Sequence, residues 1–298
     1  MRLLLGIMWL LHFLPLPILG RFGEFIGSIF YLILPSRRHI TLTNLRLCFP
    51  ELSESERVKI AKQHFKAYAR SVFERSILWW SSEQRVRRLI RVEPGAPLDL
   101  IKAGPVILLC PHFVSLDVAG IGLVLQTPIC SIYAPQKNAV FDEALKNGRN
   151  RFGLVRLLSR AEGVKPIIRA MREGYGFLML PDMDFGIKDA EFVPFFGIPA
   201  ATLTAPARIS AATNAKVVPV IATMLPNYQG WRVTVHPAWE NYPGDDIVAA
   251  TKFMNTFLEE QIRKTPAEYF WSHRRFKTRP AGDAIADVRK IYTPLNFG

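Results

Sequence analysis

The sequence of 298 residues has few cysteines, no internal repeat and no uninterrupted apolar run of the roughly 20 residues that an ordinary spanning helix needs. Cys48, Cys110 and Cys130 form no CxxC pair, so neither a disulfide framework nor a zinc site is predicted, and a reducing compartment is expected. Acidic residues are also scarce, with 25 Asp and Glu against 38 Lys and Arg. The net charge of +13 favours an anionic partner: nucleic acid, a membrane surface, a phosphorylated substrate or an acidic protein.

The N-terminal sequence favours a membrane surface among these anionic partners. Leu3 to Leu19 is apolar except for one histidine and is broken by Pro15 and Pro17, and a second apolar stretch, Phe25 to Leu34, follows two charged residues. Two such segments predict a membrane anchor in residues 1–36, which either spans the bilayer or lies in its interface. A cleaved secretory signal is the alternative for the first segment, and an ordinary buried helix is the alternative for the second.

Residues 37–298 read as one α/β domain. Ser53 and Glu56 have the spacing of a capping box and open a helix that ends near Trp79 and Trp80. These two rings are expected to be core anchors, the alternative being a position at a bilayer interface. Short apolar runs then alternate with helix-length segments at 139–151 and 164–173, and a last helix is expected over 247–264. The predicted strands are Val106–Cys110, Ile129–Tyr133, Gly176–Leu180, Val217–Met224 and Trp231–Val235. This alternation is typical of a mostly parallel sheet covered by helices.

Polar residues follow two of these strands, where chemistry gathers in such sheets. His112 lies directly after the first strand, and Asp117 falls five residues later, in the first turn of an expected helix capped by Ser115. Asp117 is expected to reach back to one imidazole nitrogen and leave the other free to take a proton from a hydroxyl. The alternative for Asp117 is a purely structural interaction with the helix dipole.

The second group is Asp182 and Asp184, after the strand that ends at Leu180. Two carboxylates at this spacing either hold a divalent metal or anchor neighbouring arginines, and the second reading is favoured because no third acidic ligand is near. Arg149 and Arg151 are candidates to clamp a phosphate or stabilise an oxyanion, the alternative being a solvated helix end. A further basic run near the C-terminus is expected to be a solvated face; it comprises His273, Arg274, Arg275, Lys277 and Arg279.

Taken in order, these blocks resemble the bacterial lipid A late acyltransferases, the lauroyl and myristoyl transferases within the lysophospholipid acyltransferase superfamily. The resemblance covers nearly the whole chain. The blocks that carry it are Asn44-Leu45-x-x-Cys48-Phe49-Pro50-Glu51, His112-x4-Asp117, Gly148-Arg149-x-Arg151, Pro181-Asp182-x-Asp184-Phe185-Gly186, Phe192-Val193-Pro194-Phe195-Phe196-Gly197, Ala201-Thr202-Leu203-Thr204 and Trp271-x-His273-Arg274-Arg275-Phe276-Lys277-Thr278-Arg279-Pro280.

The resemblance implies transfer of a fatty acyl chain from acyl carrier protein to a hydroxyl of an immature lipid A precursor, at the cytoplasmic face of the inner membrane. It implies no cofactor and no metal, with His112 as general base oriented by Asp117. Arg149 and Arg151 would bind or stabilise substrate, and Asp182 would be essential with Asp184 in support. Many members of the lipid A family carry Glu at the position of Asp117. An aspartate at this position is the form that is common in glycerolipid relatives.

Three rival functions remain open. A glycerolipid or ornithine-lipid acyltransferase would share the same chemistry at His112 and Asp117. A thioesterase on the same scaffold would use water as the acceptor. A basic membrane-bound module without catalysis would bind nucleic acid, but the basic residues are dispersed and form no recognisable nucleic-acid motif, so no nucleic-acid partner is expected.

Overall fold

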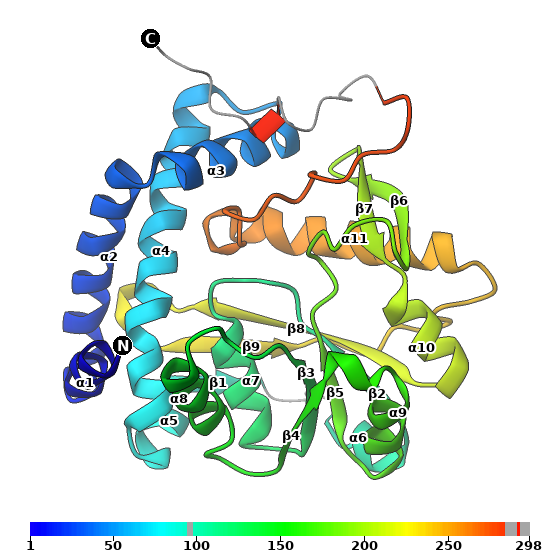
Figure 1. Cartoon of the computed structure of the whole chain (residues 1–298), viewed down its shortest axis with the longest axis horizontal. Helices are drawn as coiled ribbons and strands as arrows, with labels where there is room; N and C mark the ends of the chain where they lie inside the picture. The colour runs from blue at the N-terminus through cyan, green and yellow to red at the C-terminus, as the bar shows by residue number, and fades with distance from the viewer. Residues whose placement is uncertain (94–97, 284–290, 293–298) are drawn as a thin grey trace.

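A mostly parallel seven-stranded sheet forms the centre of the computed structural model, which describes residues 1–93, 98–283 and 291–292 (Figure 1). The strand order is β1-β9-β8-β2-β5-β3-β4, and every neighbouring pair is parallel except β8 with β9. The strands are β1 (Ile90–Val92), β2 (Val106–Leu109), β3 (Ile129–Tyr133), β4 (Val155–Ser159), β5 (Gly176–Met179), β8 (Lys216–Met224) and β9 (Trp231–Val235). A separate antiparallel hairpin is formed by β6 (Ala190–Phe195) and β7 (Ile198–Leu203). The predicted fold class is confirmed.

Helices cover both faces of this sheet. They are α1 (Arg2–Leu11), α2 (Leu16–Ile33), α3 (Pro35–Cys48), α4 (Glu54–Trp80), α5 (Glu83–Leu89), α6 (Leu100–Ala103), α7 (Leu116–Val124), α8 (Ala139–Arg149), α9 (Lys165–Arg172), α10 (Ala205–Thr213) and α11 (Ile247–Lys264), with 3₁₀ turns at Arg160–Glu162, Pro226–Tyr228 and Pro266–Glu268. The capping box at the start of α4 is present, since Ser53 accepts from the Glu56 backbone and Glu56 accepts from the Ser53 backbone.

Strand β2 shows how two cores arise from one sheet. Successive side chains of a strand point to opposite faces. Ile107 and Leu109 therefore join the core that includes α9 and α11, whereas Val106 and Leu108 join the core that includes α7 and the C-terminal end of α4. All four side chains are buried, which explains why the strand reads as a continuous apolar run.

The N-terminal helices divide differently from the sequence prediction. The break falls at the prolines, between α1 and α2, and the charged residues Arg21 and Glu24 lie inside the continuous helix α2. Pro15 and Pro17 fit there because proline is tolerated in the first turn of a helix. Arg21 and Glu24 are accommodated on the flank of α2, where Arg21 lies over the Tyr228 ring and Glu24 pairs with Arg70.

Candidate functional site

The loop that follows β2 carries His112, and the neighbouring strand β5 leads to Asp182. Asp182 accepts a hydrogen bond from the His112 backbone N–H at 2.9 Å and a second, at 2.7 Å, from ring atom Nδ1. The same loop is held by a segment near the C-terminus, because His112 O accepts from Phe270 N and Phe113 forms a β-bridge with Tyr269. The His112 loop therefore has a fixed backbone and a fixed ring orientation.

Electrostatics favour an ionised Asp182. Burial raises the pKa of this carboxyl, but the adjacent His112 more than offsets burial and the pKa lies below its usual value. An ionised Asp182 keeps the proton of a neutral imidazole on Nδ1, which leaves Nε2 unprotonated. The His112 side chain is 17% exposed, so the ring is reachable from outside while its partner carboxylate is buried.

Asp117 does not make the contact that the sequence predicted. The structure places Asp182 at His112 Nδ1, whereas Asp117 lies between two arginines, with Arg75 Nε 2.6 Å from Oδ2 and Arg149 Nη2 2.9 Å from Oδ1. Burial raises the pKa of Asp117, but Arg75 and then Arg149 outweigh it and hold the pKa well below its usual range. The five-residue spacing between His112 and Asp117 carries no information about Arg75, because Arg75 lies on the distant helix α4.

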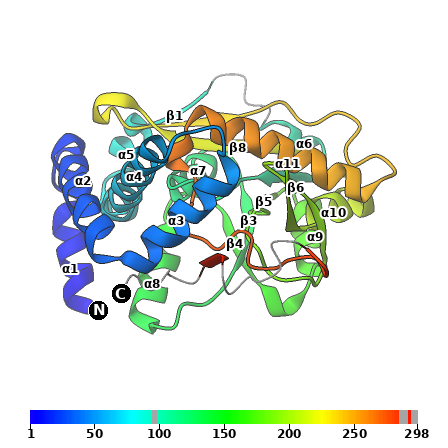
Figure 2. The ribbon, with the colours of Figure 1, turned by 90° about the horizontal axis from the view of Figure 1, so that it is seen from above.

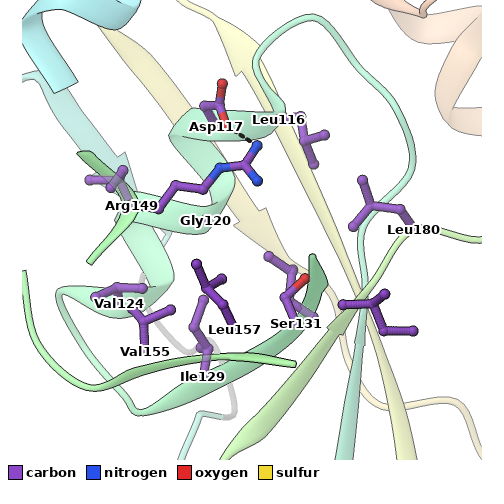
Figure 3. A pocket seen from close by; sticks show the side chains of 13 residues that line it. Leu116, Asp117, Gly120, Val124, Ile129, Ser131, Arg149, Val155, Leu157 and Leu180 are labelled. Atoms are coloured by element: carbon purple, nitrogen blue, oxygen red, sulfur yellow. Dashed lines mark hydrogen bonds and ion pairs between the residues drawn. The ribbon is translucent and has the colours of Figure 1, made fainter. Parts of the chain in front are cut away.

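An apolar cavity of about 110 Å³ lies between α7 and strands β3, β4 and β5. Figure 3 shows the Asp117–Arg149 pair at one end of it and Val124, Val155 and Ile129 at the other. The two ends are about 10 Å apart along α7, from the rise per residue of a helix. Leu116, four residues after His112, and Leu180, two residues before Asp182, also line the cavity. The cavity is thus lined at one end by residues that adjoin the His112 and Asp182 loops in sequence, and it runs into the sheet–helix interface.

Asp184 is used to shape its own loop. Its carboxylate accepts from Gly186 N, from Thr278 N and from Thr278 Oγ1 at 2.7 to 2.9 Å. Its backbone N–H donates to His273 Nε2 at 3.1 Å. Burial and Arg275 lower the pKa of His273 to about 4, so His273 is neutral at pH 7 and can accept this hydrogen bond. The two loop carboxylates therefore have separate tasks, with Asp182 facing His112 and Asp184 facing the C-terminal segment.

Arg151 points away from Arg149. Its guanidinium donates to Leu78 O at 3.3 Å and to Ser81 O at 2.7 Å, at the C-terminal end of α4. Such a donor satisfies carbonyl groups that a helix end leaves without partners. The structure therefore places Arg151 in contact with α4, where it fixes the end of α8 that presents Arg149.

The basic run near the C-terminus is a solvated face only at Arg274 and Lys277, which are exposed, so the sequence prediction is wrong for Arg275 and Arg279. Arg275 is 2% exposed and donates to Ala201 O and Thr202 Oγ1, both at 2.8 Å, on β7. Arg279 pairs with Asp283. Charge alone suggested solvent, whereas the carbonyl and hydroxyl groups of the hairpin supply the hydrogen bonds that make burial of a guanidinium possible.

Within residues 1–93, 98–283 and 291–292, no three His, Cys, Asp or Glu side chains lie together as a metal site would require. Asp182 and Asp184 each have the protein partners given above.

The chain matches a known protein family and several characterised relatives. The family model for the bacterial lipid A biosynthesis acyltransferases matches residues 1–278. The chain is 32% identical over 286 residues to the lipid A biosynthesis palmitoleoyltransferase of Escherichia coli (strain K12), with 94% of this chain and 92% of the relative covered. It is 31% identical over 282 residues to the lauroyltransferase of the same organism, covering 93% and 91%, and 32% identical over 292 residues to its myristoyltransferase, covering 94% and 86%.

Proposed function

We propose, from the premise that this chain belongs to the bacterial lipid A biosynthesis acyltransferase family of enzymes, that it transfers a fatty acyl chain from acyl carrier protein to a hydroxyl of an immature lipid A precursor. The reaction takes place at the cytoplasmic face of the inner membrane, with residues 1–36 as the anchor and residues 37–298 as the acyltransferase domain. The observation that carries the proposal is the His112–Asp182 pair together with an apolar cavity lined by Leu116 and Leu180, which adjoin the loops of that pair in sequence. An apolar cavity bordered by a base suits an acyl chain whose reacting carbonyl stays at the polar end.

In this mechanism His112 Nε2 accepts the proton of the acceptor hydroxyl as its oxygen attacks the thioester carbonyl. The tetrahedral intermediate then expels the thiolate of the carrier, which takes the proton from the imidazolium. Asp182 holds Nδ1–H throughout and stabilises the imidazolium. No covalent enzyme intermediate is needed.

Arg149 is assigned to the developing oxyanion, because it lines the cavity together with Leu116, which follows the His112 loop in sequence, and is partly exposed. Asp117 and Arg75 keep it there. In this revised role Asp117 positions an arginine rather than the imidazole. The basic net charge of +13 also suits an acidic carrier protein and a phosphorylated acceptor.

The test is a membrane assay with acyl carrier protein donors of different chain length and a tetra-acylated lipid A precursor, read by mass spectrometry. Wild type is compared with His112→Ala and with His236→Ala, a control histidine on the segment after β9. Gain of one acyl mass that is lost only in His112→Ala supports the proposal.

The rival functions give different products in the same assay. Acylation of an added lysophospholipid in place of the precursor indicates a glycerolipid acyltransferase, and release of free fatty acid alone indicates a thioesterase. Full activity of His112→Ala contradicts the mechanism.

A further inference from the structure

We propose that α1 and α2 lie in the plane of a membrane surface, with one apolar face inserted into a single leaflet, and that neither helix crosses the bilayer. This inference rests on the proposed membrane location of the enzyme, but not on its reaction chemistry. Both views of the molecule place the two helices at one edge (Figures 1 and 2). By length and composition α2 is apolar enough to span, so its packing has to decide the question.

The inner face of α2 is fixed against the rest of the protein by glycines. A Cβ at Gly20 would lie 2.4 Å from the Tyr228 ring, one at Gly23 2.7 Å from Arg70 Cα, and one at Gly27 2.5 Å from Phe65 O. The contacts of Gly23 and Gly27 are with the backbone of α4, so α2 and α4 approach each other backbone to backbone between these two glycines. The helix is therefore part of the folded domain and not a free anchor on a linker.

Helix α4 is unsuited to the bilayer interior. It runs antiparallel to α2, since Gly23 meets Arg70 whereas the later Gly27 meets Phe65. Around the level of Gly27, α4 exposes the charged side chains Lys62 and Lys66. If α2 spanned the membrane, these lysines would enter the hydrocarbon with it, where a charged side chain is strongly unfavourable. Packing thus excludes a spanning α2 unless the α2–α4 interface separates.

The outer surface of the two helices is apolar and solvent-exposed. Phe25 is 64% exposed and Leu3 79% exposed, and the other large exposed side chains of this surface are Leu4, Ile7, Trp9, Leu10, Phe13, Ile18, Phe22, Leu32, Ile33 and Leu34. On α2 the exposed positions 18, 22, 25 and 32 form one stripe opposite the glycines. Helix α1 has 10 residues and is about 15 Å long, half the thickness of a bilayer core. We call this surface the N-terminal apolar face.

A lipid leaflet fits this face better than a second copy of the chain. Exposed Arg2 and Arg37 stand at its two ends, where they can meet anionic headgroups. The face also continues toward the site. A groove of about 470 Å³ is lined by Leu5 of α1, by Trp79 and Trp80, and by Gly148 and Arg151 on either side of Arg149. A helix lying in the leaflet would therefore hold the cavity-lining end of α8 near the lipid surface.

Membrane topology is tested by single-cysteine labelling of the full chain in oriented membrane vesicles. Cys48, Cys110 and Cys130 are all buried, so their reaction with an impermeant maleimide is expected to be low. Cysteine is introduced at Arg2 and at Ser36, one beyond each end of the apolar segments, and at exposed Lys102 as the marker for the catalytic domain. In-plane helices predict that all three positions react from the same face of the membrane.

Reaction of Arg2→Cys from the face opposite to Lys102→Cys would overturn the in-plane arrangement and leave the proposed acyl transfer intact. Recovery of the protein in the soluble fraction would overturn the arrangement together with the proposed membrane location. Loss of acyl transfer in the mass-spectrometry assay, with same-face labelling, would instead refute the function alone.

The apolar face itself is tested by sedimentation with vesicles of phosphatidylethanolamine and phosphatidylglycerol. Phe25→Ser is expected to bind roughly tenfold more weakly than wild type, because one large inserted side chain is lost. The matched control is Phe253→Ser on α11, a phenylalanine of 50% exposure away from the N-terminal apolar face. Unchanged binding by Phe25→Ser, or self-association through this face with no vesicle binding, would contradict the proposal.

Discussion

Asp182 binds both the backbone and the ring of His112, through its two carboxylate oxygens. A side chain that fixes both the position and the tautomer of the proposed base is sensitive to isosteric change. In Asp182→Asn one oxygen becomes an N–H donor, which cannot accept from Nδ1–H and favours the other tautomer.

We expect Asp182→Asn to lower kcat by roughly 10²- to 10⁴-fold, with little change in the mid-point of thermal unfolding. The matched control is Asp189→Asn, an exposed aspartate of the same loop region with positive φ, a conformation that asparagine tolerates. Equal rates for Asp182→Asn and wild type would remove Asp182 from the mechanism.

Gly120 is expected to set how long an acyl chain the cavity accepts. A Cβ there would meet only Leu178 Cδ2 at 3.8 Å, so a larger side chain can be built and would project into the cavity. Gly120→Val should shift the preference in kcat/KM toward shorter acyl donors, and Val155→Ala at the far end should shift it toward longer ones.

The control for chain length is Gly122 on the same helix. Its Cβ would lie 3.1 Å from Ile90 and Val233, on the packed side of α7. Gly122→Ala is therefore expected to change stability without changing the donor preference. A donor profile for Gly120→Val that matches wild type would show that the chain binds elsewhere.

Arg75 is predicted to support activity from outside the cavity. Without Arg75, the carboxylate of Asp117 pairs only with Arg149. Asp117 is then less firmly held, and the position of the Arg149 guanidinium is less well defined. Arg75→Gln should reduce kcat/KM by roughly 10- to 100-fold and lower the free energy of unfolding by about 1–3 kcal/mol. Arg87→Gln, at an exposed pair with Glu83, should change neither. Normal kinetics in Arg75→Gln would refute the positioning role.

His273 is predicted to act as a hydrogen-bond acceptor for the Asp184 backbone. His273→Ala should slow the reaction, because the loop that carries Asp182 and Asp184 loses the hydrogen bond from the Asp184 backbone N–H to His273 Nε2. His273→Gln should recover part of the rate, since its side-chain oxygen can accept in the place of Nε2. Recovery by Gln separates this role from simple packing; equal rates for the two variants would contradict it.

Glu268 is expected to make stability depend on pH. Burial raises its pKa from 4.5 to about 7, against the opposing hydrogen bond from Met224 N. A carboxyl with a raised folded pKa stabilises the fold most below the unfolded pKa, and the stabilisation is lost as pH rises through the folded pKa. Glu268→Gln keeps an acceptor for Met224 N and has no such dependence.

The measurement is urea unfolding of both proteins at pH 5 and pH 8. The free energy of unfolding of Glu268→Gln should rise relative to wild type by about 2 kcal/mol between these values. Using the difference cancels the contributions of other titrating groups. A difference that stays constant with pH would show that folding does not raise the pKa of Glu268.

Periodicity was sufficient to predict much of the fold. The bounds expected for β3, β9 and α11 are those observed, because each is an uninterrupted pattern ended by turn or capping residues. Strand β4 was not predicted: Val155–Ser159 contains Arg156 and Ser159, which are tolerated because β4 lies at the edge of the sheet. The division into residues 1–36 and 37–298 stays a prediction.

The sequence was sufficient to predict which residues belong to the candidate site, but not which of them contact one another. Strand-end placement brought out His112 and Asp182 separately, and sequence order then favoured the nearer Asp117 as the partner. Which carboxylate reaches the imidazole depends on the pairing of β2 with β5, which brings together residues 70 positions apart. The local spacing of residues around His112 does not predict this pairing. The burial of Arg275 likewise depends on a distant hairpin.

The dependence of the His112 loop on residues near the C-terminus has a consequence for biosynthesis. Phe270 and Tyr269 hold the His112 loop, and Thr278 holds Asp184. During translation α1 and α2 leave the ribosome first, whereas these contacts form only after almost the whole chain has emerged. A nascent or prematurely terminated chain thus carries the apolar N-terminal helices without a completed catalytic loop.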